Sequence, residues 1–303
     1  MSSSRLAVLF LAAGYGSRLQ RDIRADASQQ YAHLLGIPKA LLPLAGKPLI
    51  EHWLELFRAL PTAITASNGA TLEFDATRDC FIICNDFFHG QFQAWAQRPG
   101  VGFPPGQILN DGSTSNETRL GAIRDLALAI STFGLHERPV LVVAGDTLFL
   151  KSFSLEAFLT AALTRPDSEA SLVTCYDIGS EDTRKTGILE IDGDRRVVGF
   201  VEKPEPTETT SRLACPCFYF LAPAALRQLD LFLEHKKQLH GGDQEHGSDA
   251  AAAVPWLEEI DATGRLLAWL IHQVDVYASE IEGRLDIGGL ASYIDAEAYM
   301  KSD

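Results

Sequence analysis

The first half of the chain alternates short apolar runs with segments whose apolar residues recur every three or four positions. The unbroken apolar run 6–13 ends at a glycine-rich turn, as expected of a strand buried on both faces of a sheet. The other predicted strands are 80–85, 107–110 and 139–144, and the predicted helices are 48–60, 87–97 and 115–132. Strands that alternate with helices form right-handed βαβ units. The pattern therefore predicts an α/β fold with a Rossmann-like open sheet, mixed but mostly parallel, flanked by helices.

The start of the third predicted helix has its own signal. Thr114 and Glu117 have the spacing of a capping box, in which each side chain bonds the other residue's backbone N–H. The apolar residues that then share one helical face are Leu120, Ile123, Ala127 and Ile130. We therefore expect this helix to begin near Ser115.

The pattern changes after residue 150, where short strands follow one another without long helices between them. The predicted strands are 170–175, 187–191, 197–201 and 217–221, and the predicted helices are 223–237 and one that ends near Met300. The Asp192-Gly193-Asp194 turn joins two of these strands, which predicts a β-hairpin inserted in this half. The polar stretch 240–247 contains two histidines and two acidic residues, but no regular ligand spacing, so we expect an exposed loop there instead of a metal site.

Composition narrows the class of protein. Of the 303 residues, 46% are hydrophobic and 22% are charged, which is typical of a globular protein. The net charge of −14 argues against a nucleic-acid-binding surface, which needs a basic footprint. The longest N-terminal apolar run is too short to span a bilayer, which takes about 20 residues, so we expect no membrane partner. The five cysteines form no regular framework, which predicts buried reduced thiols and a cytoplasmic location. The oligomeric state cannot be read from the sequence.

Two segments near the N-terminus contain candidate phosphate-binding residues. The first, LAAGYGSRL at 11–19, is a glycine-rich bend after a buried strand, where backbone N–H groups can approach a phosphate closely. Arg18 can add a charge-assisted grip on that phosphate. The second, PKALLPLAGKPLIEH at 38–52, places the lone cation Lys39 among apolar residues and prolines. Neither segment has the spacing of a dinucleotide fingerprint or of a P-loop.

Together these segments closely resemble the signature of the nucleoside-diphospho-sugar pyrophosphorylase family, LAAGxGxRL followed by PKxLLPLxGKPLIEH. The resemblance implies that the loop wraps a nucleoside triphosphate and that Arg18 and Lys39 bind its phosphates. The residues that it assigns to the nucleotide are Leu11, Ala12, Ala13, Gly14, Gly16, Ser17, Arg18 and Lys39. One departure is the segment Gln20–Ile37, which is a longer insertion than the family has between the two halves of its signature.

Three later segments extend the resemblance over almost the whole chain. Asp146 follows a buried strand in VVAGD, and the resemblance makes it a catalytic residue and a magnesium ligand. A hairpin ending in EKP implies that Gly187, Glu202 and Lys203 contact the sugar phosphate. LDIG near the C-terminus resembles the family's W-x-DIG motif without its aromatic residue, and makes Asp286 the second Mg²⁺ ligand. We expect one domain, 1–303, with a nucleotide-binding half at about 1–150 and a substrate-binding half at about 151–303.

Each later motif also has a structural interpretation. Asp146 can be a turn residue, Glu202-Lys203 a solvated pair before a proline, and Asp286 a cap of the last helix. The candidate base-reading residues Ser115, Asn116 and Thr118 can equally serve only to cap a helix. Their loop differs from that of the sugar enzymes and is closer in character to that of cytidylyltransferases acting on phospho-alcohols. Cys217 also stands where the family has a glycine.

These observations predict a nucleotidyltransferase that joins an NTP to a small phosphorylated substrate, most simply a sugar phosphate, and releases pyrophosphate with the help of Mg²⁺. Attack at the α-phosphorus needs positioning and charge stabilisation more than covalent chemistry from the protein. One alternative is a cytidylyltransferase acting on a phospho-alcohol such as phosphocholine. The other is an inactive regulatory homologue, although the candidate phosphate-binding and metal-binding residues are all present.

Overall fold

A ten-stranded mixed sheet runs through the centre of the protein. The computed structural model describes residues 3–239 and 256–302, so the stretch 240–247 lies outside the described residues. The strands of the sheet are β2 (Ala7–Leu11), β7 (Cys80–Cys84), β8 (Ile108–Asn110), β9 (Val140–Ala144), β11 (Ser171–Asp177), β12 (Gly187–Ile191), β13 (Val197–Glu202), β14 (Leu213–Ala214), β15 (Phe218–Leu221) and β16 (Val276–Glu280). They lie in the order β13-β12-β14-β11-β15-β9-β2-β7-β8, with β16 paired to β11.

The two halves of the sheet pair differently. Strands β9, β2, β7 and β8 are parallel, as the βαβ pattern predicted. Beyond β9 the neighbours are antiparallel except for β11 and β16, because hairpins and returning loops join strands there. The predicted α/β fold with an open mixed sheet is confirmed. The prediction that this sheet is mostly parallel was wrong, because its parallel pairs are confined to the first half and to the β11–β16 pair, and the other five pairs of described strands are antiparallel. The β12–β13 hairpin turns at Asp192, whose N–H donates to the Arg196 carbonyl.

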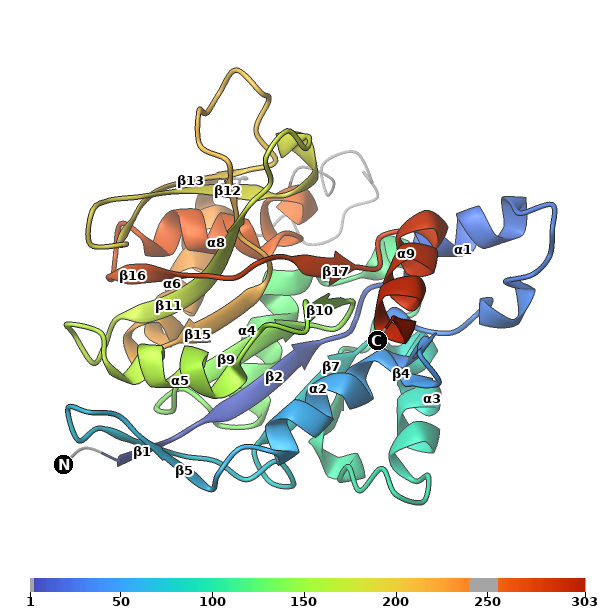
Figure 1. Cartoon of the computed structure of the whole chain (residues 1–303), viewed down its shortest axis with the longest axis horizontal. Coiled ribbons are helices and arrows are strands. Elements are labelled where there is room, and N and C mark those ends of the chain that lie inside the picture. The colour runs from blue at the N-terminus through green and yellow to red at the C-terminus, as the bar shows by residue number, and fades with distance from the viewer. Residues whose placement is uncertain (1–2, 240–255, 303) are drawn as a thin grey trace.

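Helices cover both faces of the sheet. They are α1 (Ser17–Ala25), α2 (Leu49–Arg58), α3 (Asp86–Ala96), α4 (Ala122–Thr132), α5 (Leu155–Leu163), α6 (Pro223–Leu239), α8 (Thr263–Leu270) and α9 (Leu290–Lys301). Alternate residues of β2 point to opposite faces: Val8 and Phe10 pack with α2, α3, α5 and α9, whereas Ala7 and Leu9 pack with α4, α6 and α8. In Figure 1, α2 and α5 lie in front of the sheet and α4 and α6 behind it. The run 6–13 is apolar throughout because both faces are covered.

Small sheets extend the core at its margins. Strand β6 (Thr71–Glu73) pairs with β1 (Ser3–Arg5) and β5 (Ala63–Thr65), and β3 (Pro43–Leu44) pairs with β4 (Lys47–Pro48). A two-stranded ribbon joins β10 (Thr147–Phe149) to β17 (Arg284–Asp286), which are far apart in the sequence. This ribbon connects directly to α9 and brings the C-terminal segment beside the segment that leads from β2 to α1 (Figure 1).

The predicted start of α4 at Ser115 was wrong. The helix begins at Ala122, and a separate short 3-10 turn occupies Asn116–Thr118. The capping box is also shifted by one residue, because Ser115 and Thr118 form it instead of Thr114 and Glu117. Gly121 separates the two elements with a φ of 92°, a conformation that ends helical geometry. A side chain there would also press on the Ile260 carbonyl, 3.0 Å from the Cβ position.

The inserted segment Gln20–Ile37 folds back on the protein. It contains the rest of α1 and a 3-10 turn at Ala32–Leu34. The Gln20 side chain is buried and accepts a hydrogen bond from the Gly36 N–H at 2.8 Å, which closes the segment on itself. Among the described residues, no helix combines the length and apolar character needed to cross a bilayer. All five cysteines are free thiols, four of them buried, in keeping with their apolar surroundings in the sequence.

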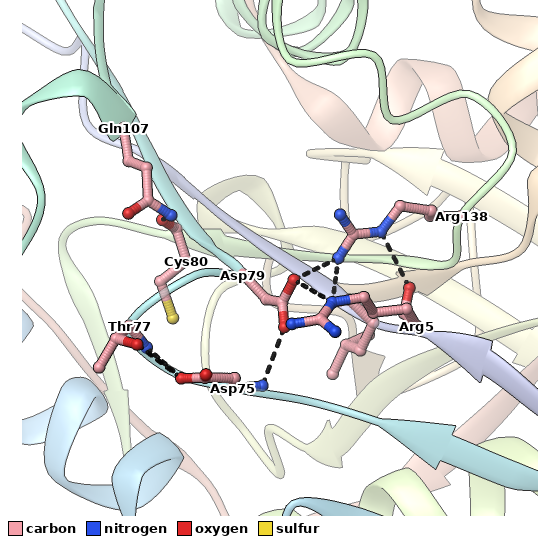
Figure 2. Close-up of polar contacts among 8 residues, drawn as sticks. Arg5, Asp75, Thr77, Asp79, Cys80, Gln107 and Arg138 are labelled. Atoms are coloured by element: carbon pink, nitrogen blue, oxygen red, sulfur yellow. Dashed lines mark hydrogen bonds and ion pairs between the residues drawn. The ribbon is translucent and has the colours of Figure 1, made fainter.

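A buried ion cluster joins the strands at their amino ends. The side chain of Asp79 is 2% exposed and lies between two arginines, at 2.8 Å from Arg5 Nε and 2.6 Å from Arg138 Nη2 (Figure 2). It also accepts a hydrogen bond from the Asp75 N–H. Arg138 Nη2 donates to the Leu6 carbonyl as well, so one carboxylate connects the starts of β2 and β7 with the loop before β9.

Candidate active site

A cavity with two adjoining lobes lies at the carboxyl ends of β2 and β9. The large lobe has a volume of about 930 Å³ and the small lobe about 350 Å³. The residues that line both lobes are Asp146, Lys185, Thr186, Lys203, Asp261, Arg284 and Asp286. Open α/β sheets bind their ligands at this edge, so the fold places the cavity where a substrate site is expected.

The glycine-rich loop forms one wall of the large lobe. Gly14, Tyr15, Gly16, Ser17 and Arg18 all line it. Gly16 has a φ of 62°, in the left-handed region that favours glycine, and immediately precedes α1. The first backbone N–H groups of that helix have no partner within the helix and favour an anion.

Two polar contacts hold this loop in place. The buried Asn85 side chain donates to the Ala13 carbonyl at 2.7 Å, while its oxygen accepts from the Phe88 N–H and caps α3. The Tyr15 hydroxyl donates to Ser113 Oγ at 3.1 Å, which ties the loop to the segment after β8. The loop is therefore held on both sides before any ligand binds.

Lys39 and Asp146 form an ion pair in the floor of the large lobe. Lys39 Nζ donates to Asp146 Oδ2 at 2.9 Å, and both side chains are partly exposed to the cavity. The glycine of the Gly-Asp motif is explained by close packing, because a Cβ on Gly145 would lie 2.8 Å from the Leu11 carbonyl oxygen. Behind the site, the buried Trp53 indole donates to the Thr147 carbonyl at 2.7 Å and fixes the residue after Asp146.

The β10–β17 ribbon brings Asp286 beside Asp146. Thr147 and Asp286 are directly opposite in the ribbon, and Thr147 Oγ1 lies 3.4 Å from Asp146 Oδ1 and 3.5 Å from Asp286 Oδ1. Burial within the cavity raises the pKa of Asp286, and the charge of Asp146 raises it further, against the opposing effect of Arg284. The structural interpretation of Asp286 as a helix cap is wrong, since Gly289 is the N-cap of α9.

The small lobe contains the predicted substrate-binding residues. The Glu202 side chain packs against two glycines. A Cβ on Gly187 would lie 3.0 Å from Glu202 Oε2, and a Cβ on Gly264 would lie 2.0 Å from it. Burial raises the pKa of Glu202, and the nearby charge of Lys203 offsets only part of this increase. Lys203 has a φ of 51°, an unusual conformation for a residue with a side chain, and such strain costs about 1–3 kcal/mol. Strained backbone of this kind is concentrated at binding sites.

Of the three predicted base-reading residues, one lines the cavity and two do not. Asn116 lines the large lobe. Ser115 and Thr118 bond to each other's side chains and backbone, and neither is among the residues that line the lobes in the described chain. This favours capping as their role.

The other predicted residues are distributed as follows. Those that line the large lobe are Gly14, Gly16, Ser17, Arg18, Lys39, Asp146, Lys203 and Asp286, and those that line the small lobe are Leu11, Asp146, Gly187, Glu202, Lys203 and Asp286. Ala12 and Ala13 are buried in the wall behind the loop. Cys217, at the departure from the family pattern, lines the small lobe.

Several lining residues have no counterpart in the sequence predictions. Arg119 forms an ion pair with Asp261 at 3.1 Å, and both residues line the large lobe. Thr263 starts α8 in the small lobe and lies 3.3 Å from the Tyr219 hydroxyl. Arg284 borders both lobes and makes a 3.4 Å contact with Asp286. Burial lowers the pKa of Arg284, but Asp286 and Tyr176 outweigh this and raise it, so the guanidinium stays charged.

Two carboxyl groups lie together where the loop that follows β8 meets α4. Asp111 accepts hydrogen bonds from the backbone and side chain of Ser113. Asp125 on α4 is buried beside it, and its Oδ1 has no hydrogen-bond partner in the described part of the chain. Burial and the charge of Asp111 raise the pKa of Asp125 to about 8, with a smaller contribution from Asp261 and an opposing one from Arg124.

This pair predicts a pH-dependent stability. The folded protein holds a proton on Asp125 that the unfolded chain releases near pH 4, so the free energy of unfolding falls as pH rises from about 4 to about 8. Asp125→Asn keeps the shape without the charge. We expect it to be more stable than the wild type by up to about 5 kcal/mol at pH 8.5, the size of a pKa shift from about 4 to about 8 at about 1.4 kcal/mol per unit, and nearly equal at pH 4.5.

Urea unfolding of both proteins at the two pH values measures this difference. The matched control is Asp194→Asn, at an exposed turn position, whose stability should follow the wild type at both pH values. A stability difference for Asp125→Asn that is the same at pH 4.5 and pH 8.5 would show that Asp125 is ionised throughout.

The donor set around Asp146 is small. Among the described residues there is no group of three or more His, Cys, Asp or Glu side chains placed to hold a metal ion. Asp146 and Asp286 form a pair of carboxylates that both line the cavity. A hard cation held by one or two carboxylates usually takes its remaining ligands from phosphate oxygens and water, as Mg²⁺ does.

Comparison with known proteins identifies the relatives of this site. Residues 7–302 match the nucleotidyl transferase family. A UTP–glucose-1-phosphate uridylyltransferase of Pseudomonas aeruginosa is 29% identical over 227 residues, 71% of this chain and 74% of the relative. A second P. aeruginosa protein of that name is 27% identical over 298 residues, 95% of this chain and 93% of the relative. The structure of a UDP-glucose pyrophosphorylase complexed with UDP-glucose has a TM-score of 0.64 at 18% identity, covers 99% of both chains and shares the fold. The chain therefore belongs to the nucleotidyl transferase family, as an enzyme of its nucleotide-sugar pyrophosphorylase group.

Proposed function

We propose that this enzyme joins an NTP to a sugar phosphate and releases pyrophosphate in the two-lobed cavity. The observation that supports this most is the cluster at the junction of the lobes, where Lys39, Asp146, Asp286 and Arg284 lie together. Two anionic reactants must meet at one point for this reaction, and a junction with both cations and carboxylates fits that need.

The large lobe is proposed to hold the nucleotide. Its wall of loop N–H groups and the start of α1 suit a phosphate chain, and Arg18 and Lys39 add two cations. Asn116, which lines this lobe, is the proposed contact of the base or ribose. These cations are concentrated in one cavity of a protein whose net charge is −14, which favours anion binding there specifically.

The small lobe is proposed to hold the sugar phosphate. Lys203 can bind the phosphate, and the Glu202 carboxylate can accept hydrogen bonds from sugar hydroxyls. A quaternary ammonium group such as that of phosphocholine is usually held by several aromatic rings. Of the described residues that line this lobe, Tyr219 alone is aromatic, and its hydroxyl lies against Thr263. This lining therefore favours a hydroxylated substrate.

The residues present also fit Mg²⁺. Asp146 and Asp286 would hold it, and the ion, when bound, would neutralise negative charge on the phosphates. The protein's own contribution is to orient two anions and to offset their charge. An oxygen of the acceptor phosphate forms a bond to the α-phosphorus while the bond to the β-phosphate oxygen breaks, and that oxygen leaves with its electron pair on pyrophosphate. Lys39 and Arg18, which line the large lobe, are the proposed groups that stabilise the leaving charge.

A pyrophosphate-release assay with four NTPs against sugar 1-phosphates and phosphocholine tests this proposal. UTP with glucose 1-phosphate is the first pair to test, because both P. aeruginosa relatives are named for it. We expect a sugar 1-phosphate to exceed phosphocholine in kcat/KM at least about 100-fold, because a site with polar groups for hydroxyls rejects a ligand without them. Release with CTP and phosphocholine alone would assign the small lobe to a phospho-alcohol.

A further inference from the structure

Among the described residues, Arg284 is the one arginine that lines both lobes of the cavity. It stands two residues before Asp286, where the terminal motif of the family has its aromatic residue. Its side chain is 17% exposed and borders both lobes of the cavity. A mostly buried guanidinium is retained at low cost only where acceptors surround it.

The protein satisfies this guanidinium only in part. Nε donates to the Tyr176 hydroxyl at 3.1 Å, and Nη1 makes one long contact of 3.4 Å with Asp286 Oδ1. Arginine has five N–H donors, and its strong pairing with a carboxylate or phosphate uses two parallel bonds. Within the described chain the remaining donors of Arg284 have no protein acceptor, and the residue lines the cavity.

Position decides which phosphate these donors can reach. Ser17 and Arg18 line only the large lobe, whereas Arg284 and Lys203 line both lobes. Arg284 also shares the small lobe with Glu202, which we assign to the sugar. The guanidinium is therefore at the boundary that the acceptor phosphate must occupy in order to attack the nucleotide.

We propose that Arg284 binds the phosphate of the acceptor substrate and orients it for attack, with Lys203 as the second cation. In the enzyme without substrate, the contact with Asp286 positions the guanidinium of Arg284. When the acceptor binds, its phosphate replaces this contact or adds a second one. This inference rests on the proposed nucleotidyl transfer and adds a residue to its acceptor side.

Three variants test the assignment. Arg284→Gln removes the charge, Arg284→Lys keeps a charge without the paired donors, and Arg195→Gln is the control. Arg195 donates to the Ala278 carbonyl and approaches Glu280, and it lines neither lobe in the described chain. Steady-state kinetics give the KM for each substrate, and calorimetric titration with glucose 1-phosphate alone, without NTP or metal, gives a binding constant that does not depend on turnover.

For Arg284→Gln we expect the KM for the sugar phosphate to rise by about 10- to 100-fold, the scale of a lost hydrogen bond to a charged group. The KM for the NTP should change less than about twofold. Binding of glucose 1-phosphate in the titration should weaken in parallel, Arg284→Lys should fall between the two, and Arg195→Gln should match the wild type.

Equal rises in both KM values, or a loss of kcat with glucose 1-phosphate binding unchanged, would overturn the assignment and make Arg284 a support for Asp286. Arg284→Lys, which keeps the buried charge, remains informative if Arg284→Gln does not fold. If the wild type binds glucose 1-phosphate through Arg284 but releases no pyrophosphate with any NTP, the proposed function fails while the phosphate site stands.

Discussion

Replacing Asp146 by asparagine is expected to lower kcat/KM for pyrophosphate release at least about 100-fold, the scale of losing one electrostatic stabiliser in a catalytic site. The substitution keeps the size of the side chain and removes the charge that pairs with Lys39 at 2.9 Å. It also removes one of the two carboxylates beside Thr147. Lys39→Ala removes the other partner of this ion pair and is expected to lower kcat/KM by a similar factor.

The controls separate charge at this site from folding. Lys47→Ala removes a lysine of the same segment that pairs with Glu55 and does not line the lobes of the described structure, so its kinetics should match the wild type. Circular dichroism and thermal unfolding show whether each variant is folded. A folded Asp146→Asn enzyme that retains near-normal release would remove Asp146 from the mechanism.

Truncating Asp79 to alanine is expected to lower the free energy of unfolding by about 3–5 kcal/mol, since removing one partner of a buried ion cluster leaves the others uncompensated. The cluster contains Arg5 and Arg138 and also accepts the Asp75 N–H (Figure 2). All of these groups are at the amino ends of the strands, on the edge of the sheet away from the cavity.

Unlike the Asp146 and Lys39 variants, the folded Asp79→Ala protein should keep its enzymatic activity. In the temperature range where Asp79→Ala is folded, we expect its KM values to equal those of the wild type. Urea unfolding measures the stability loss, with Asp230→Ala at an exposed position of α6 as the control. A loss below about 1 kcal/mol for Asp79→Ala would show that solvent compensates the two arginines, which are each partly exposed.

The regular elements were predictable because each has a local cause. The buried strands β2, β7 and β9 are unbroken apolar runs, and α2 and α3 have apolar residues at helical spacing. The start of α4 was not predictable from local signals, since Thr114 and Glu117 imitate a capping box one residue away from the real one. Gly121 has a positive φ before α4, and a side chain there would press on Ile260, a residue far along the chain.

The candidate site residues that belong to a sequence motif were predictable. Those that come together only in the folded chain were not. Lys39, Asp146 and Asp286 belong to recognisable segments, and the structure brings them together through the β10–β17 ribbon. Arg284 and the Arg119–Asp261 pair have no such signal. Arg119 and Asp261 are separated by a long stretch of sequence, as are Arg284 and Tyr176, and a lone charged residue in one sequence is far more often an exposed one. The missing aromatic of the terminal motif was the one local sign that position 284 is special.

The most direct test of nucleotidyl transfer is to identify the phosphorus-containing products of the wild-type enzyme. The reaction contains UTP, glucose 1-phosphate and Mg²⁺ and is monitored by ³¹P NMR. Attack at the α-phosphorus predicts two new phosphorus signals of a diphosphate diester and one of inorganic pyrophosphate, in a one-to-one ratio of the two products. Added pyrophosphate should convert part of the diphosphate diester back to UTP and glucose 1-phosphate. Formation of UDP with orthophosphate or with a diphosphorylated sugar, in place of pyrophosphate, would place the attack at the γ-phosphorus and contradict the account.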